Sequence, residues 1–264
     1  MATEPRRFEG RVAFVTGGAS GIGQVVAERL ALEGAAILLA DQNIDKAQVV
    51  ADGIQANGGS VETASCDVSD AEQVDAAFAK AHEKFGPLDI LVNSAAIPQV
   101  RPFLKMTLAE WQKVIDVNMT GSFLCAQAAA KAMVAADKAG RIIQISSINA
   151  QRAITGRGAY SVAKGGLAIM VKVMAAELGQ AGITVNAVAP GPVDTPMVLE
   201  MHTQETRAAF NAHLPIKRYA QPAEVAAATA FLASDEAAYI TGHTINVDGG
   251  FDAAGMLFDL GPLG

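Results

Sequence analysis

The chain has 264 residues, of which 51% are hydrophobic and 18% are charged, so it can bury the core of one large α/β domain spanning residues 1–264. The net charge of -7 and the scattered basic residues argue against nucleic acid or an anionic membrane surface as a partner. Cys66 and Cys125 are the only cysteines and lack metal-ligand spacing, so we expect no metal and no disulfide framework. No apolar run reaches membrane-spanning length, and we expect a cytoplasmic protein.

Short apolar runs alternate with helical patterns along the whole chain. This alternation is typical of βαβ units and of a parallel sheet with helices on both faces. The strands are predicted at residues 12–15, 36–40, 61–65, 90–92, 142–146, 184–187 and 244–247. The predicted fold class is therefore α/β.

Several helix ends carry chemical signals. Ser69 with Glu72 and Thr107 with Glu110 match capping boxes, in which two side chains satisfy the first free N–H groups of a helix. Other signals are Pro222, which opens a helix running toward Ser234, and the predicted helix stops Gly34, Gly58 and Gly86. Residues 195–215 show mixed polarity and no clear strand, so they form either a mobile cover over a site or an ordinary pair of surface helices.

A glycine-rich turn follows the first predicted strand. Gly17, Gly21 and Gly23, with Ser20 and Ile22 between them, lead directly into a helix. Glycine allows positive φ angles and lets a phosphate approach backbone N–H groups at the positive end of the helix. The spacing G-x-x-x-G-x-G differs from the common dinucleotide fingerprint G-x-G-x-x-G, and a plain strand-to-helix turn is the alternative interpretation.

Asp41 ends the second predicted strand. A carboxylate there can accept hydrogen bonds from the ribose diol of an adenosine and would repel a 2′-phosphate. Neither Gly18 nor Gln42 offers that phosphate a positive charge. We therefore predict NAD rather than NADP as cofactor, although a strand-end turn residue is the simpler role for Asp41.

Tyr160 and Lys164 are four residues apart in an apolar segment with helical character. That spacing places both side chains on one helix face, where an ammonium would lower the pKa of the phenol from its usual value of about 10. The tyrosine could then act as a general acid or base at neutral pH. Ser147 lies thirteen residues before Tyr160, and strand alternation directs it and Ser146 to opposite faces.

Together these motifs resemble the short-chain dehydrogenase/reductase family, and the resemblance runs from Phe8 to Gly250. It implies a doubly wound, Rossmann-type parallel sheet of seven strands in the order 3-2-1-4-5-6-7, with a nicotinamide dinucleotide across the carboxyl ends of the strands. Asn93-Ser94-Ala95-Ala96 stands where the family usually has Asn-Asn-Ala-Gly.

The resemblance also assigns residues. The implied catalytic residues are Asn118, Ser147, Tyr160 and Lys164. The implied cofactor-binding residues are Gly17, Ser20, Gly21, Ile22, Gly23, Asp41, Asp67, Val68, Asn93, Ala95, Tyr160, Lys164, Pro190, Gly191, Val193 and Thr195. In this scheme Tyr160 exchanges a proton with the alcohol oxygen, Ser147 hydrogen-bonds that oxygen, and Lys164 lowers the tyrosine pKa and orients the nicotinamide ribose. Asn118 would hold a water that relays protons to solvent.

The substrate is the least determined feature of the sequence. By their distance from the catalytic residues along the chain, the candidates are Ile97, Pro98, Gln99, Asn149, Arg152, Arg157, Met197 and Met201. The asparagine and arginines suit a hydroxylated or carboxylated compound, and the methionines suit an apolar wall. We expect an NAD-dependent oxidoreductase that interconverts a secondary alcohol, such as a small polyol or sugar, with its ketone.

Alternatives remain open. A 3-oxoacyl carrier-protein reductase is the nearest enzymatic one, and a non-catalytic dinucleotide sensor on the same fold is another.

The helical patterns at residues 123–133 and 167–178 are apolar on more than one face, and the resemblance implies that they form the contacts of a homotetramer. The apolar tail 251–264 either docks on a neighbour, closes the pocket or is a frayed terminus.

Overall fold

The computed structural model describes residues 6–255 and 257, and these contain one parallel sheet of seven strands. The strands are β1 (Val12–Thr16), β2 (Ala36–Asp41), β3 (Ser60–Ser65), β4 (Ile90–Asn93), β5 (Gly140–Ile145), β6 (Ile183–Pro190) and β7 (Thr244–Val247). Their order in the sheet is β3-β2-β1-β4-β5-β6-β7. The predicted fold class and strand order are confirmed.

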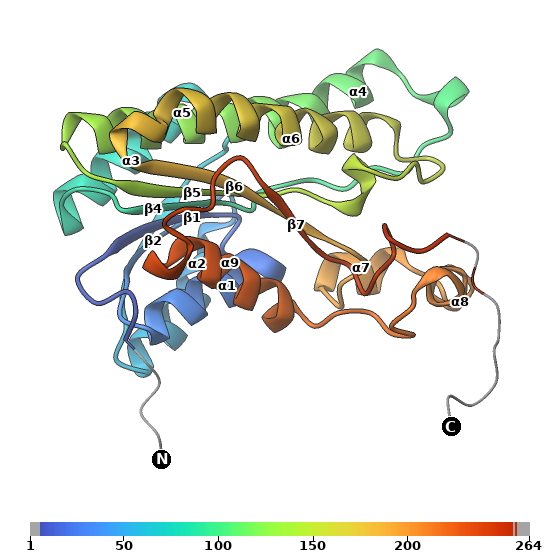
Figure 1. The fold of residues 1–264 in the computed structure, drawn as a ribbon, viewed down its shortest axis with the longest axis horizontal. Helices are drawn as coiled ribbons and strands as arrows, with labels where there is room; N and C mark the ends of the chain where they lie inside the picture. The colour runs from blue at the N-terminus through green and yellow to red at the C-terminus, as the bar shows by residue number, and fades with distance from the viewer. Residues whose placement is uncertain (1–5, 256, 258–264) are drawn as a thin grey trace.

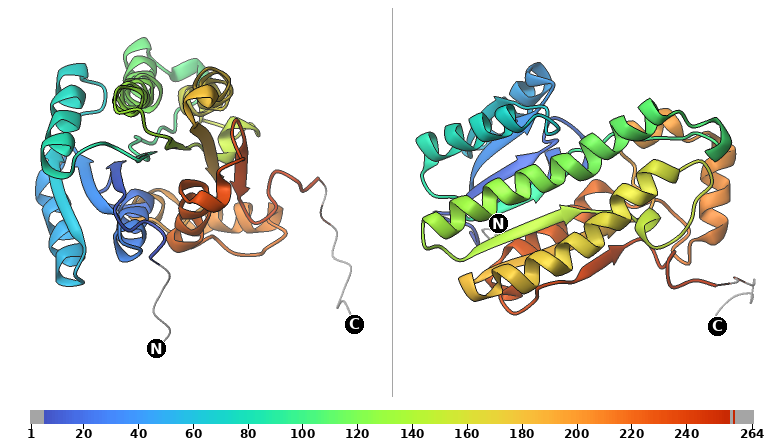
Figure 2. Two further views of the ribbon diagram at one scale, coloured as in Figure 1. Left: turned by 60° about the vertical axis from the view of Figure 1, so that its left-hand side comes forward. Right: turned by 90° about the horizontal axis from the view of Figure 1, so that it is seen from above.

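Helices cover both faces of this sheet (Figure 1). They are α1 (Gly21–Leu32), α2 (Ile44–Ala56), α3 (Ala71–Phe85), α4 (Leu108–Ile115), α5 (Gly121–Ala135), α6 (Gly158–Leu178), α7 (Pro196–Met201), α8 (Gln204–His213) and α9 (Pro222–Ala233). The views in Figure 2 place α3, α5 and α6 on one face and α1, α2 and α9 on the other. The short helices α7 and α8 lie beyond the carboxyl end of β6.

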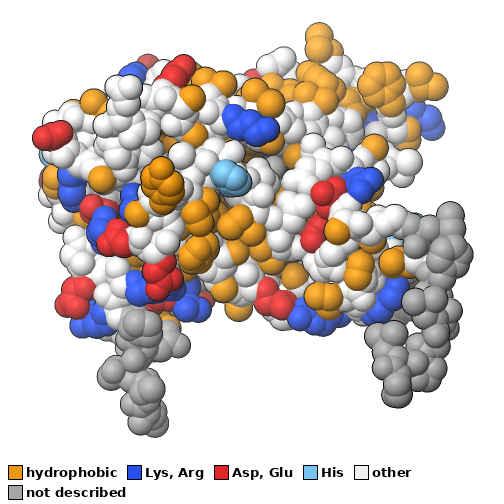
Figure 3. Space-filling model, in the orientation of Figure 1, with side chains coloured by type: hydrophobic (Ala, Val, Ile, Leu, Met, Phe, Trp, Pro, Cys, Tyr) orange, Lys and Arg blue, Asp and Glu red, His pale blue; other side chains and the backbone are white. Residues whose placement is uncertain are grey.

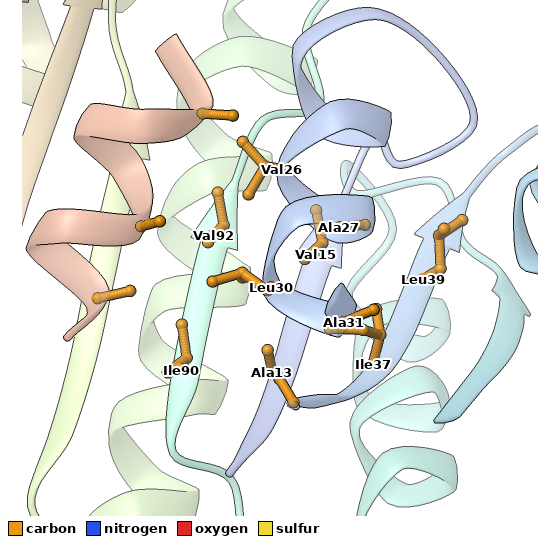
Figure 4. Packing of buried hydrophobic residues seen from close by; sticks show 14 of the residues in the cluster. Ala13, Val15, Val26, Ala27, Leu30, Ala31, Ile37, Leu39, Ile90 and Val92 are labelled. Atoms are coloured by element: carbon orange, nitrogen blue, oxygen red, sulfur yellow. The ribbon is translucent and has the colours of Figure 1, made fainter. Parts of the chain in front are cut away.

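Alternating side chains of the strands build a core on each face. Ala13 and Val15 of β1 point to the cluster that includes Val26 and Leu30 of α1 (Figure 4), whereas Phe14 between them points to the opposite cluster. Successive strand residues face opposite sides of a sheet, and here both sides are covered. This is why the strands read as continuous apolar runs in the sequence.

The helix signals of the sequence are mostly confirmed. Thr107 and Glu110 form the predicted capping box of α4, and Pro222 is the first residue of α9. The cap predicted at Ser69 is wrong, because the Asp70 side chain accepts from the first N–H groups of α3. The Ser69 hydroxyl donates instead to Asp67 at 2.6 Å. The predicted helix stops Gly34, Gly58 and Gly86 follow α1, α2 and α3 with φ angles of 102°, 81° and 84°.

The segment 195–215 contains the helix pair α7 and α8, which was one of its two predicted forms. His202 Nδ1 lies 2.9 Å from the hydroxyl of Tyr219, and Arg207 forms an ion pair with Asp194 at 2.5 Å. These contacts hold the helix pair against the chain on either side of it. The tail prediction falls mainly on residues outside the described ones, but Phe251 lies with its ring centroid 6.0 Å from that of Phe210 in α8.

The carboxyl end of β6 depends on residues near the end of the chain. The Gly191 N–H donates to the Val247 carbonyl at 2.9 Å, and a Cβ at Gly191 would lie 2.7 Å from Asp248 Cα. Only glycine permits this close approach of two backbones. None of the described helices is long and apolar enough to cross a membrane.

Candidate active site

A cavity of about 520 Å³ opens at the carboxyl ends of the central strands. Its wall includes the residues that directly follow β1, β4, β5 and β6, namely Gly17, Ser94, Ser146 and Gly191. Parallel strands that end together leave such a crevice where the strand order reverses, here between β1 and β4. The predicted cofactor and catalytic residues come from segments far apart in the sequence, and most of them meet here.

The glycine turn after β1 accepts no larger residue at two positions. Gly17 has a φ angle of 66°, and a Cβ there would lie 2.7 Å from Ala95 Cα. A Cβ on Gly23 would lie 2.2 Å from the Gly17 carbonyl oxygen. Gly17, Ser20, Gly21 and Ile22 line the cavity, whereas Gly23 does not line it and serves to close the turn. The N-terminus of α1 therefore faces the cavity, where it favours an anionic group.

Asp41 lines the same cavity at the end of β2. Its carboxylate accepts hydrogen bonds from the Ala19 N–H at 3.1 Å and from the Asn43 N–H at 2.9 Å. These two bonds fix the carboxylate beside the glycine turn. The wall formed by residues 17–42 contributes no Lys or Arg to the cavity, so its charge there is negative.

Among the other predicted cofactor residues, Asp67, Val68, Ala95, Pro190, Gly191, Val193 and Thr195 line the cavity. Asn93 does not line it, because its Nδ2 donates to the Ser122 carbonyl at 3.0 Å and so ties β4 to α5. The Thr195 hydroxyl accepts from the Val198 N–H at 3.3 Å, which leaves its own proton free to donate into the cavity.

The three predicted reactive side chains meet at the inner end of the cavity. Ser147, Tyr160 and Lys164 all line it, and the Ser147 hydroxyl hydrogen-bonds the Tyr160 phenol. Lys164 Nζ lies 5.9 Å from the centroid of the Tyr160 ring and donates to the Ile145 carbonyl at 2.6 Å. Ser146 also borders the cavity, but its hydroxyl donates to the Lys164 carbonyl at 3.2 Å.

The titration of the pair differs from the sequence-based expectation. Burial raises the pKa of the Tyr160 phenol, opposed in part by the hydrogen bond from Ser147 and by the charge of Arg157. Burial also lowers the pKa of Lys164 to about 8. The expected lowering of the tyrosine pKa is not found, because burial has the largest effect on the phenol and raises its pKa. A protonated Tyr160 is a proton donor, which suits reduction of a ketone at neutral pH.

Asn118 lies in a π-helical stretch, Asp116–Thr120, between α4 and α5. It is fully buried, and its side chain makes paired hydrogen bonds to Ile97, accepting from the N–H at 2.8 Å and donating to the carbonyl at 3.0 Å. Single π-helical turns are rare and often occur at functional sites. Asn118 does not line the cavity, but it fixes Ile97, which does.

A second cavity of about 90 Å³ adjoins the first through Ser147 and Tyr160. It receives four of the predicted substrate candidates, namely Pro98, Asn149, Arg157 and Met201, while Met197 lines both cavities. Gln99 and Arg152 line neither, and Arg152 is exposed and pairs with Asp252 at 2.8 Å.

Sequence reasoning missed other wall residues. Lys113 and Val117 line the first cavity, and His202 and Phe210 line the second. Lys113 and Val117 are four residues apart, and that helical spacing before Asn118 was the available signal. The described residues contain no group of three or more His, Cys, Asp or Glu side chains that could hold a metal ion.

Known proteins share this architecture. The family model described as Enoyl-(Acyl carrier protein) reductase matches residues 17–252. A 3-oxoacyl-[acyl-carrier-protein] reductase of Synechocystis sp. is 42% identical, over 91% of this chain and 96% of its own. A D-threitol dehydrogenase of Mycolicibacterium smegmatis is 38% identical, over 93% of this chain and 94% of its own. A solved short-chain type dehydrogenase/reductase from Mycobacterium marinum superposes with a TM-score of 0.89 at 35% identity, over 93% and 97% of the two chains.

The chain belongs to the short-chain dehydrogenase/reductase family and is of the oxidoreductase kind. The family binds a nicotinamide dinucleotide, and the residues present here fit one. The turn can close only because Gly17 and Gly23 lack a Cβ, and the cavity continues from this turn to Tyr160.

Proposed function

We propose that the protein is an NAD(H)-dependent oxidoreductase that interconverts a secondary alcohol with its ketone, the alcohol being a small polyol, sugar or related hydroxy compound. The observation that carries the cofactor preference is the Asp41 carboxylate, held at the cavity by the N–H groups of Ala19 and Asn43. A 2′-phosphate would meet this negative charge at close range, whereas a ribose diol can donate hydrogen bonds to it.

The chemistry assigned to the chain is proton transfer and orientation. A bound nicotinamide dinucleotide supplies the hydride acceptor or donor. Tyr160 gives a proton to the substrate oxygen in reduction and takes it in oxidation, and the Ser147 hydroxyl donates a hydrogen bond to the same oxygen. Lys164, buried behind them, adds positive charge that favours an anionic oxygen.

Proton exchange with solvent is assigned to the region around Asn118. Its carbonyl accepts from the Ser122 hydroxyl at 3.0 Å, and its side chain is occupied by Ile97. The relay predicted for Asn118 therefore has to use a second lone pair of that carbonyl. We propose it as a positioning residue for the wall of the cavity and as the anchor of this relay.

Reduction of a 3-oxoacyl carrier-protein substrate is the alternative. It is favoured by the 42% identity to a reductase of that kind, just as the polyol interpretation is favoured by the 38% identity to a D-threitol dehydrogenase. The two candidate functions differ in the expected cofactor. Asp41 disfavours a 2′-phosphorylated dinucleotide, whereas the reductase alternative is tested by reduction with NADPH. They also differ in the length of substrate that the site must accept.

Initial rates with both cofactors and both substrate classes test the proposal. Polyols, hydroxy acids and aryl alcohols are each supplied with NAD or NADP, and a 3-oxoacyl thioester is supplied with NADH or NADPH. We expect kcat/KM for NAD to exceed that for NADP by at least about tenfold, which corresponds to about 1.4 kcal/mol. Efficient thioester reduction with NADPH and none of the alcohols oxidised would support the alternative instead.

We also propose a homotetramer, in which neighbouring subunits cover the exposed apolar side chains of α5 and α6. Phe123, Ile169 and Val173 on these helices are 44%, 61% and 49% exposed. Apolar side chains also gather at the upper right of Figure 3, over α4 and the segment before it. Sedimentation velocity of the protein tests this assembly, and a monomer at micromolar concentration would contradict it.

A further inference from the structure

Arg157 differs from the other arginines of the chain. Each of the others forms an ion pair with an Asp or Glu side chain. Within the described residues 6–255 and 257, Arg157 has no such partner, and its side chain makes one hydrogen bond, from Nη1 to the Gln99 carbonyl at 3.2 Å. It is nevertheless largely withdrawn from solvent. A partly buried guanidinium without an acidic partner keeps most of its N–H donors for an anionic ligand.

The position of Arg157 relates it to the reacting groups. It stands immediately before α6, three residues ahead of Tyr160, and its Cζ lies 5.8 Å from the centroid of the tyrosine ring. It lines the second cavity together with Ser147 and Tyr160. A molecule whose oxygen lies between Ser147 and Tyr160 can therefore reach past the ring to this guanidinium.

The electrostatics of the second cavity follow from Arg157. Its charge acts on the Tyr160 phenol and also contributes to the lowered pKa of His202, although burial is the largest cause there. No Asp or Glu is among the lining residues of this cavity. The rest of the wall is largely apolar, with Pro98, Ile148, Ile154, Met197 and Met201.

We propose that Arg157 binds the carboxylate of the substrate, so that the protein acts on a short hydroxy acid and its oxo acid rather than on an uncharged polyol. The proposal rests on the alcohol–ketone function proposed above and specifies its substrate class. A single guanidinium matches a monoanion and presents the paired N–H groups that bind a carboxylate in a bidentate manner. The volume of about 90 Å³ and the apolar wall fit a short aliphatic chain between the two polar ends.

Matched substrate pairs test this directly. Short 2-, 3- and 4-hydroxy acids are compared with the corresponding amides, which keep the size and lose the charge. We expect kcat/KM to favour at least one acid over its amide by about tenfold or more. In Arg157→Gln this ratio should fall to near one, and Arg157→Lys should keep part of it because it keeps the charge. Equal use of acid and amide by the unmodified protein would overturn the proposal, as would an unchanged ratio in Arg157→Gln.

The matched control is Arg152→Gln. Arg152 is five residues away, is exposed, pairs with Asp252 and lines neither cavity, so its removal should leave the acid-to-amide ratio unchanged. An equal loss of the ratio in both variants would show that general surface charge, and not a site at Arg157, favours the acids.

A binding measurement separates this inference from the proposed function. Butyrate and butyramide are titrated against the protein with and without NADH, and the midpoint of thermal unfolding is recorded. We expect butyrate, but not butyramide, to raise the midpoint of thermal unfolding, and only in the protein that keeps Arg157. Arg157-dependent butyrate binding without turnover of any alcohol would uphold the anion site and refute the function. Turnover of neutral polyols with no effect of butyrate would support the proposed function and refute the anion site at Arg157.

Discussion

The Ser147 hydroxyl accepts two hydrogen bonds from Asn149, one from its backbone N–H and one from its side-chain Nδ2, both at 3.2 Å. A serine oxygen has two acceptor positions and one proton. With both acceptor positions used by Asn149, the proton of Ser147 is left to donate toward Tyr160 or the substrate oxygen. In the proposed mechanism, Asn149 thus sets the polarity of the hydrogen bond from Ser147 to the substrate oxygen.

Asn149→Ala should therefore lower kcat by about three- to tenfold, the effect of one hydrogen bond worth about 0.5–1.5 kcal/mol. The KM for the dinucleotide should stay unchanged, because Asn149 does not line the first cavity. Steady-state kinetics measure both. Gln151→Ala is the control, since Gln151 is exposed, pairs with Asn246 and lines neither cavity. An unaltered kcat in Asn149→Ala would refute this role of Asn149.

Tyr160→Phe should abolish turnover, with a loss of at least about a hundredfold, because the proton donor is removed. Dinucleotide binding should persist, since the ring and Lys164 remain. Isothermal titration with NADH and rate measurements test the two parts. Tyr239→Phe, at a fully exposed tyrosine, is the control. Substantial remaining activity in Tyr160→Phe would refute its assigned role.

Asp41→Asn should raise the ratio of kcat/KM for NADP to that for NAD by about tenfold, because a charge that repels the 2′-phosphate is lost. The comparison is made with one substrate and both cofactors. Asp52→Asn removes the same charge from the exposed side of α2, away from the cavity, and should leave the ratio as it is. If both substitutions change the ratio equally, Asp41 has no special part in cofactor choice.

Gly23→Ala should lose dinucleotide binding and destabilise the protein by about 1–3 kcal/mol, because the new methyl would overlap the Gly17 carbonyl. Gly53→Ala is its counterpart in α2, where nothing lies within 4 Å of an added Cβ, and it should stabilise by about 0.5–1 kcal/mol. Chemical denaturation measures both changes. Wild-type affinity for NADH in Gly23→Ala would show that the turn can adapt.

Ketone reduction should be fastest below about pH 7 and fall as the pH rises through about 8. Lys164 loses its charge there, because burial lowers its pKa to about 8, while the raised pKa of Tyr160 keeps the phenol protonated. Oxidation needs the phenolate, so the oxidative rate should stay low through this range and rise only at higher pH, because the pKa of Tyr160 is raised. Rates in both directions across this range provide the measurement, with exposed Lys172→Met as control. A reductive rate that rises with pH would contradict the assignment.

The fold could be predicted from the sequence because the strands are buried on both faces and appear as separate apolar runs. The family spacing to Tyr160, together with strand alternation, favoured Ser147 over Ser146. Both serines line the cavity, but the Ser146 hydroxyl donates to the Lys164 carbonyl and Ser147 interacts with Tyr160. The N-cap of a helix was harder to predict where two adjacent residues can both serve as the cap. Ser69 and Asp70 are both good N-caps, and the one not used bonds to Asp67 instead.

Other features depend on partners that are distant in the chain. Arg152 and Arg157 look alike in the sequence, and only the fold brings Asp252 to the former and Tyr160 to the latter. The direction of the Tyr160 pKa was likewise hidden, because it depends mainly on the burial of the phenol in the folded chain. The π-helical stretch that contains Asn118 has no periodic signal of its own.

The contact of Gly191 with Asp248 bears on how the enzyme is made. The wall from Pro190 to Thr195 contacts Val247 and Asp248, which are synthesised well after Gly191. A growing polypeptide can assemble the early strands during synthesis, but it cannot finish this wall until Val247 and Asp248 have been added. Premature termination anywhere before Val247 therefore yields a product that lacks a finished active site, however much of its core has formed.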